Sequence, residues 1–341
     1  MTLPLSLPRP LPLALSIGDP AGVGPELAAA AWALSDAEAL PPFLVIGSAR
    51  VVREAAQRRN ITVPVRAVKT AAEAVACFAE ALPVLDLADL PYTPGAPDDA
   101  GARLALDALG AATDLVRSGA AAALVTGPVA KSRLARVGFE HPGQTEFVAE
   151  ACGIAPENAV MMLAGPSLRV VPITVHVALR DVPDLLTAEL IRSRAAITAA
   201  ALARDYGIAQ PRLAIAGLNP HAGEDGRMGS EDAQIVAPAI SALRDAGIGA
   251  FGPLPPDTMF HAEARERYDV AICMYHDQAL IPLKALDFDA GVNVTLGLPI
   301  VRTSPDHGTA FAIAGSGSAR VGPTIAAIRM AGECAARRLQ A

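Results

Sequence analysis

The chain has 341 residues, of which 52% are hydrophobic and 18% charged, and its formal net charge is −7. A chain of this length exceeds what one hydrophobic core usually serves, so we expect two domains. Because the acidic chain has no lysine-rich tract or basic helix, it lacks the positive surface that nucleic acid requires. Proline, glycine or charge interrupts every apolar stretch well short of a membrane-spanning length, which argues against a membrane protein.

The first fifteen residues and the cysteines both favour a cytoplasmic location. Residues 1–15 are apolar but contain four prolines, and they lack the basic region and unbroken apolar run of a signal peptide. The four cysteines are scattered without a C-x-x-C pair, which is typical of small buried hydrophobic residues rather than of disulfides.

Along the chain, short β-branched segments alternate with alanine-rich helical segments. This alternation predicts an α/β fold with a parallel sheet. Proline and acidic residues mark helix starts near residues 25, 183 and 230, and a further helix is expected from Arg50. The proline-rich segments 89–98 and 252–257 are predicted to be loops. The predicted strands are residues 13–17, 43–46, 122–126, 169–175, 212–216 and 270–274.

Common nucleotide-binding and hydrolase motifs are absent. The segment Gly18-Asp-Pro-Ala-Gly-Val-Gly24 follows a predicted strand but does not match the G-x-G-x-x-G spacing of a Rossmann fold. The pair Lys131-Ser132 lacks the preceding glycine of a P-loop. No H-E-x-x-H or G-x-S-x-G motif indicates a metalloprotease or a hydrolase.

Three histidines, His176, His221 and His276, each follow an apolar run that is predicted to be a strand. Ligands of open α/β sheets bind beyond the carboxyl ends of the strands, so three imidazoles delivered there can converge. Imidazole is the commonest metal ligand among side chains. Each histidine alone could be a polar cap of its strand, but the three together favour one metal site.

Polar residues suited to chemistry concentrate in the last third of the chain. Lys284 can transfer protons if its surroundings lower its pKa, and the Arg302 guanidinium can grip a carboxylate or phosphate. Asp277 can orient the neighbouring His276, or merely cap a helix. Lys284 also fits an ordinary solvated surface residue.

Four motifs that occur together and in order carry a resemblance to a known family. They are Gly18-Asp-Pro-Ala-Gly-Val-Gly-Pro-Glu26, Gly217-Leu-Asn-Pro-His-Ala-Gly-Glu224, Met274-Tyr-His-Asp-Gln278 and Arg302-Thr-Ser-Pro-Asp-His-Gly-Thr309. From about residue 13 to near its end, the chain resembles the 4-hydroxythreonine-4-phosphate dehydrogenase family of pyridoxal phosphate biosynthesis.

The resemblance implies an isocitrate/isopropylmalate-dehydrogenase-like fold with two α/β/α domains, an active site in the interdomain cleft, and a homodimer. We assign residues 1–135 and 295–341 to the first domain and residues 136–294 to the second. The resemblance also implies NAD or NADP binding without a Rossmann fingerprint. It places Asp306, His307 and Gly308 in the cofactor loop.

Further site residues follow from the resemblance, which implies that His176, His221 and His276 hold the metal and that one of them comes from the second subunit. It maps substrate contacts onto Gln144, Thr145, Lys284, Asn293 and Arg302. The family usually has histidine where this chain has Gln144, which cannot carry a positive charge or shuttle a proton. Lys284 and Asp277 are the predicted catalytic residues.

The implied reaction is NAD-dependent oxidation of 4-phosphohydroxy-L-threonine to 2-amino-3-oxo-4-phosphooxybutanoate, which decarboxylates to 3-amino-2-oxopropyl phosphate. Three imidazoles suit Zn²⁺ or Co²⁺, while Mg²⁺ and Mn²⁺ stay open. One alternative is a sister dehydrogenase acting on a phosphorylated sugar acid or a cyclic dihydrodiol acid. A remoter one is a metal-dependent hydrolase or a non-catalytic binder, which would not bind NAD.

Overall fold

The computed structural model describes residues 11–340, so the signal-peptide prediction for the first ten residues lies outside the described part of the chain. The chain divides into two compact units. Unit 1 contains residues up to Gln144 together with Arg302–Gly332, and unit 2 contains Thr145–Val301 and the residues from Glu333 onwards. Within the described residues, each unit contains six strands together with helices, which confirms the predicted α/β class.

The sheet of unit 1 has the strand order β3-β4-β2-β1-β5-β12, and the five pairings between these neighbours are parallel. The central strand β2 is buried along its whole length, as expected for a parallel strand covered on both faces. The strands of unit 1 are β1 Leu13–Ser16, β2 Phe43–Gly47, β3 Val65–Val68, β4 Leu82–Asp86, β5 Leu124–Thr126 and β12 Arg302–Pro305.

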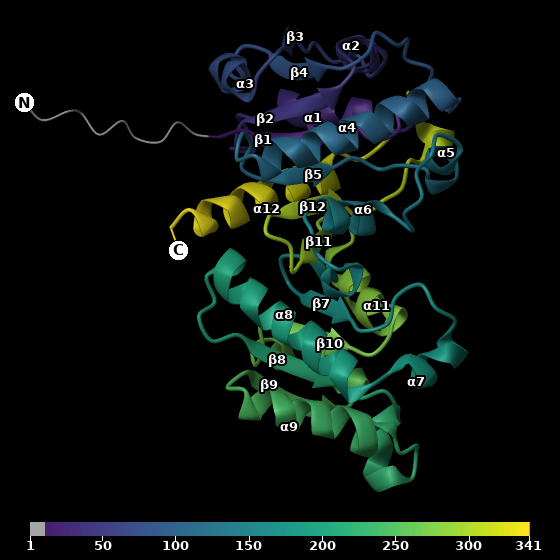
Figure 1. Ribbon diagram of the computed structural model, residues 1–341, viewed down its shortest axis with the longest axis vertical. Coiled ribbons are helices and arrows are strands. Elements are labelled where there is room, and N and C mark those ends of the chain that lie inside the picture. Colours follow the sequence, from purple (N-terminus) through teal and green to yellow (C-terminus); the bar gives the residue numbers. More distant parts are fainter. Residues whose placement is uncertain (1–10, 341) are drawn as a thin grey trace, which may run out of the picture. The chain divides into compact units, whose positions relative to one another are not determined.

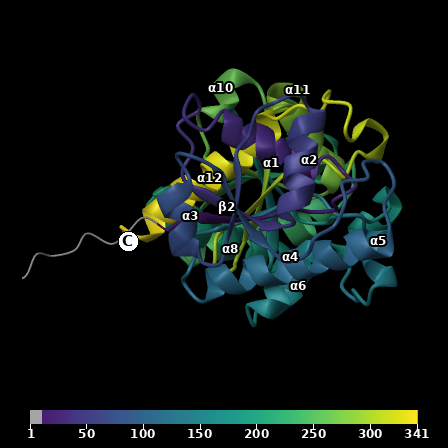
Figure 2. The ribbon, with the colours of Figure 1, turned by 90° about the horizontal axis from the view of Figure 1, so that it is seen from above.

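Helices cover both faces of this sheet. Figure 2 shows α1 and α2 on one side of β2 and α4 on the other. Ser48, Thr70 and Asp98 cap α2, α3 and α4, since each side chain accepts a hydrogen bond from a backbone N–H of the first turn. The helices of unit 1 are α1 Gly24–Ala33, α2 Ala49–Arg58, α3 Ala71–Cys77, α4 Asp99–Arg117, α5 Lys131–Arg136, the 3₁₀ turn Phe311–Ile313 and the first part of α12 Gly322–Arg338.

The sheet of unit 2 is mixed, so the prediction of a purely parallel sheet is wrong here. Its strand order is β11-β6-β7-β10-β8-β9, and β6 runs antiparallel to both β7 and β11. The four residues between β6 and β7 are too few for a parallel crossover, which requires a dozen or more. The strands are β6 Val160–Ala164, β7 Arg169–Pro172, β8 Arg212–Ala216, β9 Gly249–Leu254, β10 Val270–Cys273 and β11 Val292–Leu296.

Figure 1 shows the long helix α8 crossing in front of β8 and β10 in unit 2. Thr187 caps its first turn, and Gly207 ends it in the left-handed conformation that glycine tolerates best. The helices here are α6 Gln144–Ala151, α7 Val182–Leu185, α8 Ala188–Tyr206, α9 Ala237–Asp245, α10 Ala262–Arg265 and α11 His276–Asp287. Shorter turns are Pro156–Asn158, Leu179–Asp181, Pro220–Gly226, Asp232–Val236 and Pro256–Thr258.

The loop predicted at residues 252–257 is wrong in its first half, because residues 252–254 complete β9. β9 is the last strand in the order of unit 2, and a proline that cannot donate to the ladder is tolerated on such an edge strand. The loop predicted at residues 89–98 is confirmed, and α4 begins directly after it.

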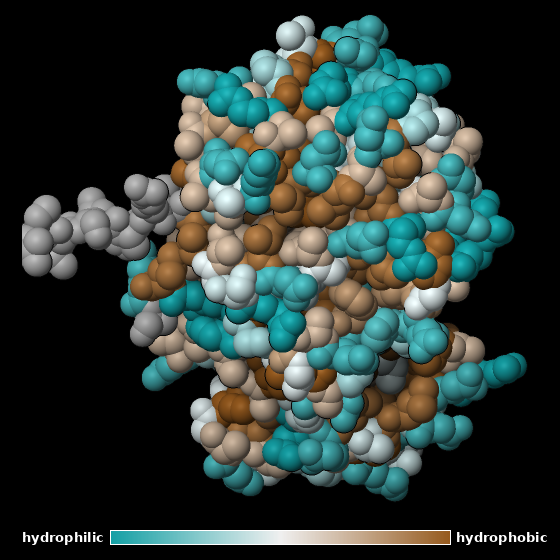
Figure 3. All heavy atoms as spheres, turned by 45° about the horizontal axis from the view of Figure 1, so that its top comes forward, coloured by the Kyte–Doolittle hydropathy of each residue, from teal (hydrophilic) through white to brown (hydrophobic). Residues whose placement is uncertain are grey.

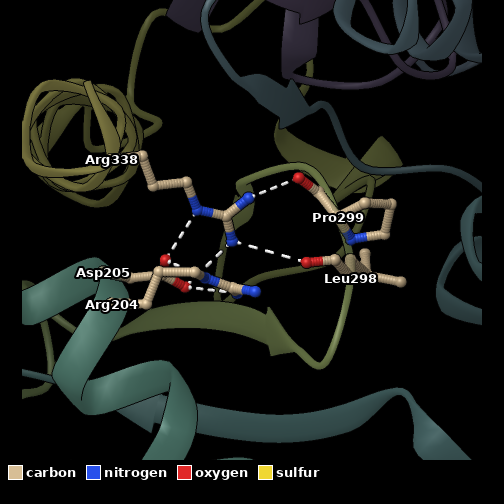
Figure 4. Close-up of polar contacts among 5 residues, drawn as sticks. All are labelled: Arg204, Asp205, Leu298, Pro299 and Arg338. Carbon is tan, nitrogen blue, oxygen red and sulfur yellow. Dashed lines mark hydrogen bonds and ion pairs between the residues drawn. The ribbon is translucent and has the colours of Figure 1, made fainter. Parts of the chain in front are cut away.

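The unit boundaries differ from the division expected from sequence, which was residues 1–135 with 295–341 and residues 136–294. β11 pairs with β6, so the segment up to Val301 groups with unit 2. The last residues of α12 also group with unit 2, and Figure 4 shows a polar network there. Arg338 bonds Asp205 at 2.6 Å through Nε, and its Nη1 donates to the Pro299 carbonyl at 2.6 Å. Arg204 bonds the same Asp205 carboxylate.

Within residues 11–340, no helix is both long and apolar enough to cross a membrane. The face shown in Figure 3 mixes hydrophilic residues with bands of hydrophobic ones. In the same part of the chain, all four cysteines are free thiols, in keeping with the prediction from their spacing.

Candidate active site

The three predicted metal ligands lie after three neighbouring strands of unit 2. β10 pairs in parallel with β7 on one side and with β8 on the other. His176 follows β7, His276 is the first residue of α11 after β10, and His221 lies in the turn after β8. This confirms the predicted placement at the carboxyl ends of adjacent parallel strands.

His176 and His276 lie close together. Their ring centroids are 5.6 Å apart, a spacing that two imidazoles bound to one tetrahedral ion would adopt, given metal–nitrogen distances of about 2 Å. The Asp277 carboxylate lies 2.7 Å from Nδ1 of His276. A carboxylate on Nδ1 leaves Nε2 to face a metal ion, so Asp277 can orient this ligand as predicted.

A cavity of about 610 Å³ opens beside this histidine pair. Its other walls are mainly apolar and come from the segment after β7, from residues near α10 and from α11. Several of these side chains are strongly exposed, with Leu179 and Ile281 each 66% accessible. The principal lining residues beside the histidines are Val177, Leu179, Phe260, Ile281 and Pro282.

His221 lies in an unusual turn. Five consecutive residues, His221 to Asp225, have positive φ angles, and only one of them is glycine. Left-handed backbone costs a non-glycine residue about 1–2 kcal/mol. His176 also has a positive φ of 55°. Strain of this kind clusters at functional sites, so the backbone independently supports the assignment of both histidines.

Two side chains that sequence reasoning did not assign hold these histidine-bearing segments. The buried Gln278 accepts from the Met274 N–H at 2.6 Å and donates to the Gly217 carbonyl at 2.8 Å, which links the segments before His276 and His221. The buried Asp232 accepts from the backbone N–H groups of Leu218 and Asn219. Gln278 is part of the quoted Met274–Gln278 motif, whereas nothing local in the sequence marks Asp232.

Arg194 of α8 supports the segment that leads to His176. Its Nη1 donates to the carbonyl of Ile173, three residues before the histidine. Burial lowers the pKa of the Arg194 guanidinium. No sequence pattern marks this residue, since an arginine in a helix usually faces solvent.

A single chain brings together only two of the three predicted ligands. Among residues 11–340, no group of three histidine, cysteine, aspartate or glutamate side chains is close enough to hold a metal ion. His176 and His276 form the pair, while the exposed His221 stays outside it.

The predicted substrate residues of unit 2 lie on three elements. Lys284 is exposed on α11, and Thr145 is half-buried in the first turn of α6. Asn293 lies on β11, and its buried Oδ1 has no hydrogen-bond partner. Because a buried carbonyl oxygen normally accepts a hydrogen bond, this atom is well suited to a ligand donor.

In unit 1, Arg302 and Gln144 reach adjacent residues at the end of β5. Arg302 is 3% exposed and donates through Nη2 to the Thr126 hydroxyl at 2.7 Å. Gln144 donates through Nε2 to the Gly127 carbonyl at 3.2 Å, while its buried Oε1 has no hydrogen-bond partner. These two predicted substrate contacts therefore share one region of unit 1.

The predicted cofactor loop follows β12 and contacts the glycine-rich segment at residues 18–26. The Val23 N–H donates to the Thr309 carbonyl at 3.0 Å. Gly22 permits this approach, because a Cβ atom there would lie 2.8 Å from the same oxygen. His307 points Nδ1 at the Gly308 carbonyl at 3.0 Å, and its buried Nε2 has no hydrogen-bond partner. Two motifs that are distant in sequence thus meet.

A family model described as pyridoxal phosphate biosynthetic protein PdxA matches residues 39–331. A 4-hydroxythreonine-4-phosphate dehydrogenase from Erythrobacter litoralis is 57% identical over 330 residues, which cover 97% of this chain and 98% of that protein.

Solved structures give a consistent result. A 4-hydroxythreonine-4-phosphate dehydrogenase from Klebsiella pneumoniae is 36% identical with a TM-score of 0.84, covering 97% of this chain and 99% of the other. A terephthalate 1,2-cis-dihydrodiol dehydrogenase from Burkholderia xenovorans is 31% identical with a TM-score of 0.64, covering 95% and 99% of the two chains.

Proposed function

The chain belongs to the PdxA family of pyridoxal phosphate biosynthetic proteins, and we propose that it oxidises 4-phosphohydroxy-L-threonine with NAD or NADP. The product, 2-amino-3-oxo-4-phosphooxybutanoate, would lose carbon dioxide to give 3-amino-2-oxopropyl phosphate. The observation that carries the proposal is the family match, whose residue range includes all three strand-end histidines. A cytoplasmic location, expected from the sequence, is part of the same proposal.

The donor set fits a divalent transition metal. His176 and His276 supply two imidazoles at a suitable separation, and we assign the third ligand to His221 of a second copy. Imidazole nitrogen suits Zn²⁺ or Co²⁺, and Mg²⁺ or Mn²⁺ remains compatible with catalysis. When bound, the metal supplies Lewis-acid stabilisation of negative charge on the substrate oxygen.

The chain's own residues would bind the substrate and move its protons. We assign the anionic ends of the substrate to the Arg302 guanidinium and the Thr145 hydroxyl, and a substrate donor to Asn293 Oδ1. Lys284 is the candidate for proton transfer to and from the reacting carbon and oxygen atoms. Asp306, His307 and Gly308 would contact the nicotinamide nucleotide, which accepts the hydride.

A homodimer is the assembly that completes the metal site in this proposal. The exposed apolar residues near His176 and on α11 form a surface that a second copy would cover. Leu179 and Ile281, which line the cavity beside the histidine pair, are each 66% exposed. Such large apolar side chains are unusual on a monomer surface when they gather beside an incomplete ligand set.

The direct test is NADH formation by metal-reconstituted protein given NAD and 4-phosphohydroxy-L-threonine, with the non-phosphorylated amino acid as the control substrate. Metal-dependent turnover of the phosphorylated compound alone is the expected result. No turnover, despite measurable NAD and metal binding, would contradict the assigned substrate.

A sister dehydrogenase activity is the second candidate, because Gln144 stands where the resembling family usually has histidine. The similarity to a cis-dihydrodiol dehydrogenase structure shows that the same fold accommodates another substrate. A panel containing a phosphorylated sugar acid and a cyclic dihydrodiol acid separates the two candidates. Absence of NAD binding would instead favour a metal-dependent hydrolase or a non-catalytic binder.

A further inference from the structure

The loop between β12 and α12, residues 306–321, is mostly exposed or half-buried but is fixed to the rest of unit 1 at a few points. Its second half joins a buried apolar cluster in which Ala319 packs with Val23 and Leu27 of the α1 region. Gly315 also approaches the loop at residues 89–98, since a Cβ atom there would lie 2.6 Å from Pro94. The proposed nucleotide loop is therefore one part of a packed assembly.

Arg59, directly after α2, bridges this loop to a buried carboxylate. Its Nη2 donates to the Ala319 carbonyl at 2.7 Å, and its Nη1 lies 3.5 Å from Oε2 of Glu26. Glu26 belongs to the first turn of α1 and its side chain is 0% exposed, while that of Arg59 is 15% exposed. A single guanidinium thus joins the interior of unit 1 to the loop backbone.

The polar atoms around this ion pair are incompletely satisfied. Within the described residues 11–340, both carboxylate oxygens of Glu26, Nη1 of Arg59 and the hydroxyl of the buried Tyr92 lack hydrogen-bond partners. Burial, reinforced by the Glu26 charge, raises the pKa of Tyr92 to about 12, so the phenol stays neutral.

Burying the charged pair costs desolvation free energy, which apolar residues filling the same volume would not incur. A purely stabilising role is therefore a poor explanation for the pair. Clustered unsatisfied polar atoms in a folded protein call for a functional explanation. Among residues 11–340, the one group outside the cluster that the pair contacts through a short hydrogen bond is the loop carbonyl of Ala319.

We propose that Arg59, held in place by the buried Glu26, is a positioning residue that fixes the 306–321 loop and thereby sets the affinity for a nicotinamide dinucleotide. The inference rests on the NAD use of the proposed function. Glu26 places the guanidinium, the guanidinium fixes the Ala319 carbonyl, and the α1 contacts at Thr309 fix the other end of the loop.

The test compares Arg59→Met and Arg59→Lys with Arg66→Met as the matched control. Arg66 is an exposed arginine of unit 1 that pairs with the exposed Glu80. We expect Arg59→Met to weaken NAD binding and raise the KM for NAD about tenfold, with kcat and the KM for the phosphorylated substrate changed by no more than about twofold. Arg59→Lys, which keeps the charge but lacks the fork, should fall between it and the wild type.

Gly22→Ala provides an independent perturbation of the same loop, because its new methyl group would press on Thr309 and leave the ion pair intact. Gly22→Ala should also weaken NAD binding. If Arg59→Met does not fold, the NAD affinity of Gly22→Ala tests the proposal. Hydrogen exchange gives a readout without cofactor, with faster exchange expected for residues 309–320 in Arg59→Met.

Calorimetry of NAD binding distinguishes failure of the Arg59 positioning role from failure of the proposed function. If the wild type binds NAD and Arg59→Met binds it equally well with unchanged loop exchange, the positioning role is overturned and the proposed function stands. If the wild type binds no NAD, the proposed function fails and this inference fails with it.

Discussion

The candidate site residues of unit 1 and unit 2 are built in opposite ways. In unit 1, Arg302 is almost fully buried and bonds Thr126, and the loop at residues 306–309 is hydrogen-bonded to the start of α1. In unit 2, His176 and His221 are exposed, and the histidine pair faces an open apolar cavity. A single chain therefore preorganises the groups of unit 1, whereas in unit 2 only His176 and His276 come together among the described residues.

Left-handed non-glycine residues occur in both units, since Ala310 of the 306–321 loop has a φ of 46°, but their longest run lies in unit 2. The left-handed residues His176 and His221 to Asp225 belong to unit 2. Arg194 braces the segment before His176, while Gln278 and Asp232 brace the segment before His221. A strained segment persists only when its surroundings over-determine it. These hydrogen bonds hold the histidine-bearing segments in their left-handed conformations.

The largest expected effect comes from breaking the unit 2 site directly. His276→Ala removes one imidazole of the close pair, so we expect the metal content to fall and kcat to drop by about a thousandfold. Metal analysis and steady-state kinetics measure both. His261→Ala is the matched control, because His261 is an exposed histidine of unit 2 outside the predicted set, and equal losses in the two variants would refute the assignment.

The contact between Arg338 at the end of α12 and Asp205 is expected to stabilise unit 2. Burial alone would raise the pKa of Asp205, but hydrogen bonds from Arg204 and Arg338 outweigh it and hold the pKa below its usual range. We expect Arg338→Met to lower the free energy of unfolding by about 3 kcal/mol at pH 7.

A depressed carboxylate pKa contributes stability above the unfolded pKa, near 4, that is lost as the pH falls through the folded value. The difference between wild type and Arg338→Met should therefore shrink on acidification below about pH 4, as measured by urea unfolding. Arg337→Met, next along the helix and paired with Glu333, is the control. A difference that stays constant down to acid pH would contradict the pairing.

Lys284 tests whether the exposed face of α11 takes part in chemistry. We expect Lys284→Met to reduce kcat by about a hundredfold while leaving NAD binding unchanged, since general acid–base groups contribute factors of that order. The exposed Lys69→Met in unit 1 controls for loss of charge. Full turnover by Lys284→Met would remove this residue from the mechanism.

The smallest effect is expected in the preorganised region of unit 1. Gln144→His would add a titratable group beside Gly127 and restore the residue usual in the resembling family. The KM for the phosphorylated substrate should fall roughly threefold at pH 6 relative to pH 8, because the imidazolium pairs with an anion. A pH profile identical to that of the wild type would show that residue 144 does not touch the charged end of the substrate.

Short sequence patterns predicted the strands and helices whose formation depends on residues close together in the chain. The buried β-branched runs of β2, β8 and β10 and the proline at the start of α1 placed strands and a helix correctly. Among the described residues, six strands were missed, namely β3, β4, β6, β9, β11 and β12. The antiparallel direction of β6 and the edge position of β9 depend on partners far away in sequence.

The site residues also divide into those that short sequence patterns predicted and those that depend on contacts distant in sequence. Strand ends identified the three histidines, and sequence adjacency suggested the contact between Asp277 and His276. Asp232, Arg194 and the Glu26–Arg59 pair could not be found in this way, since each acts on a backbone group or charge far away in sequence. The positive φ angles of His176 and His221 were not predicted either, because histidine adopts positive φ more often than most residues but still in few cases.

Mixing His221→Ala with His276→Ala protein, with subunit exchange, tests most directly the claim that unit 2 needs a second copy. Each mixed dimer would hold one site with His176 and His276 from one chain and His221 from the other, so we predict recovery of about one quarter of wild-type activity. His176→Ala mixed with His276→Ala should recover none. No recovery in the first mixture, despite confirmed exchange, would contradict a site completed across two subunits.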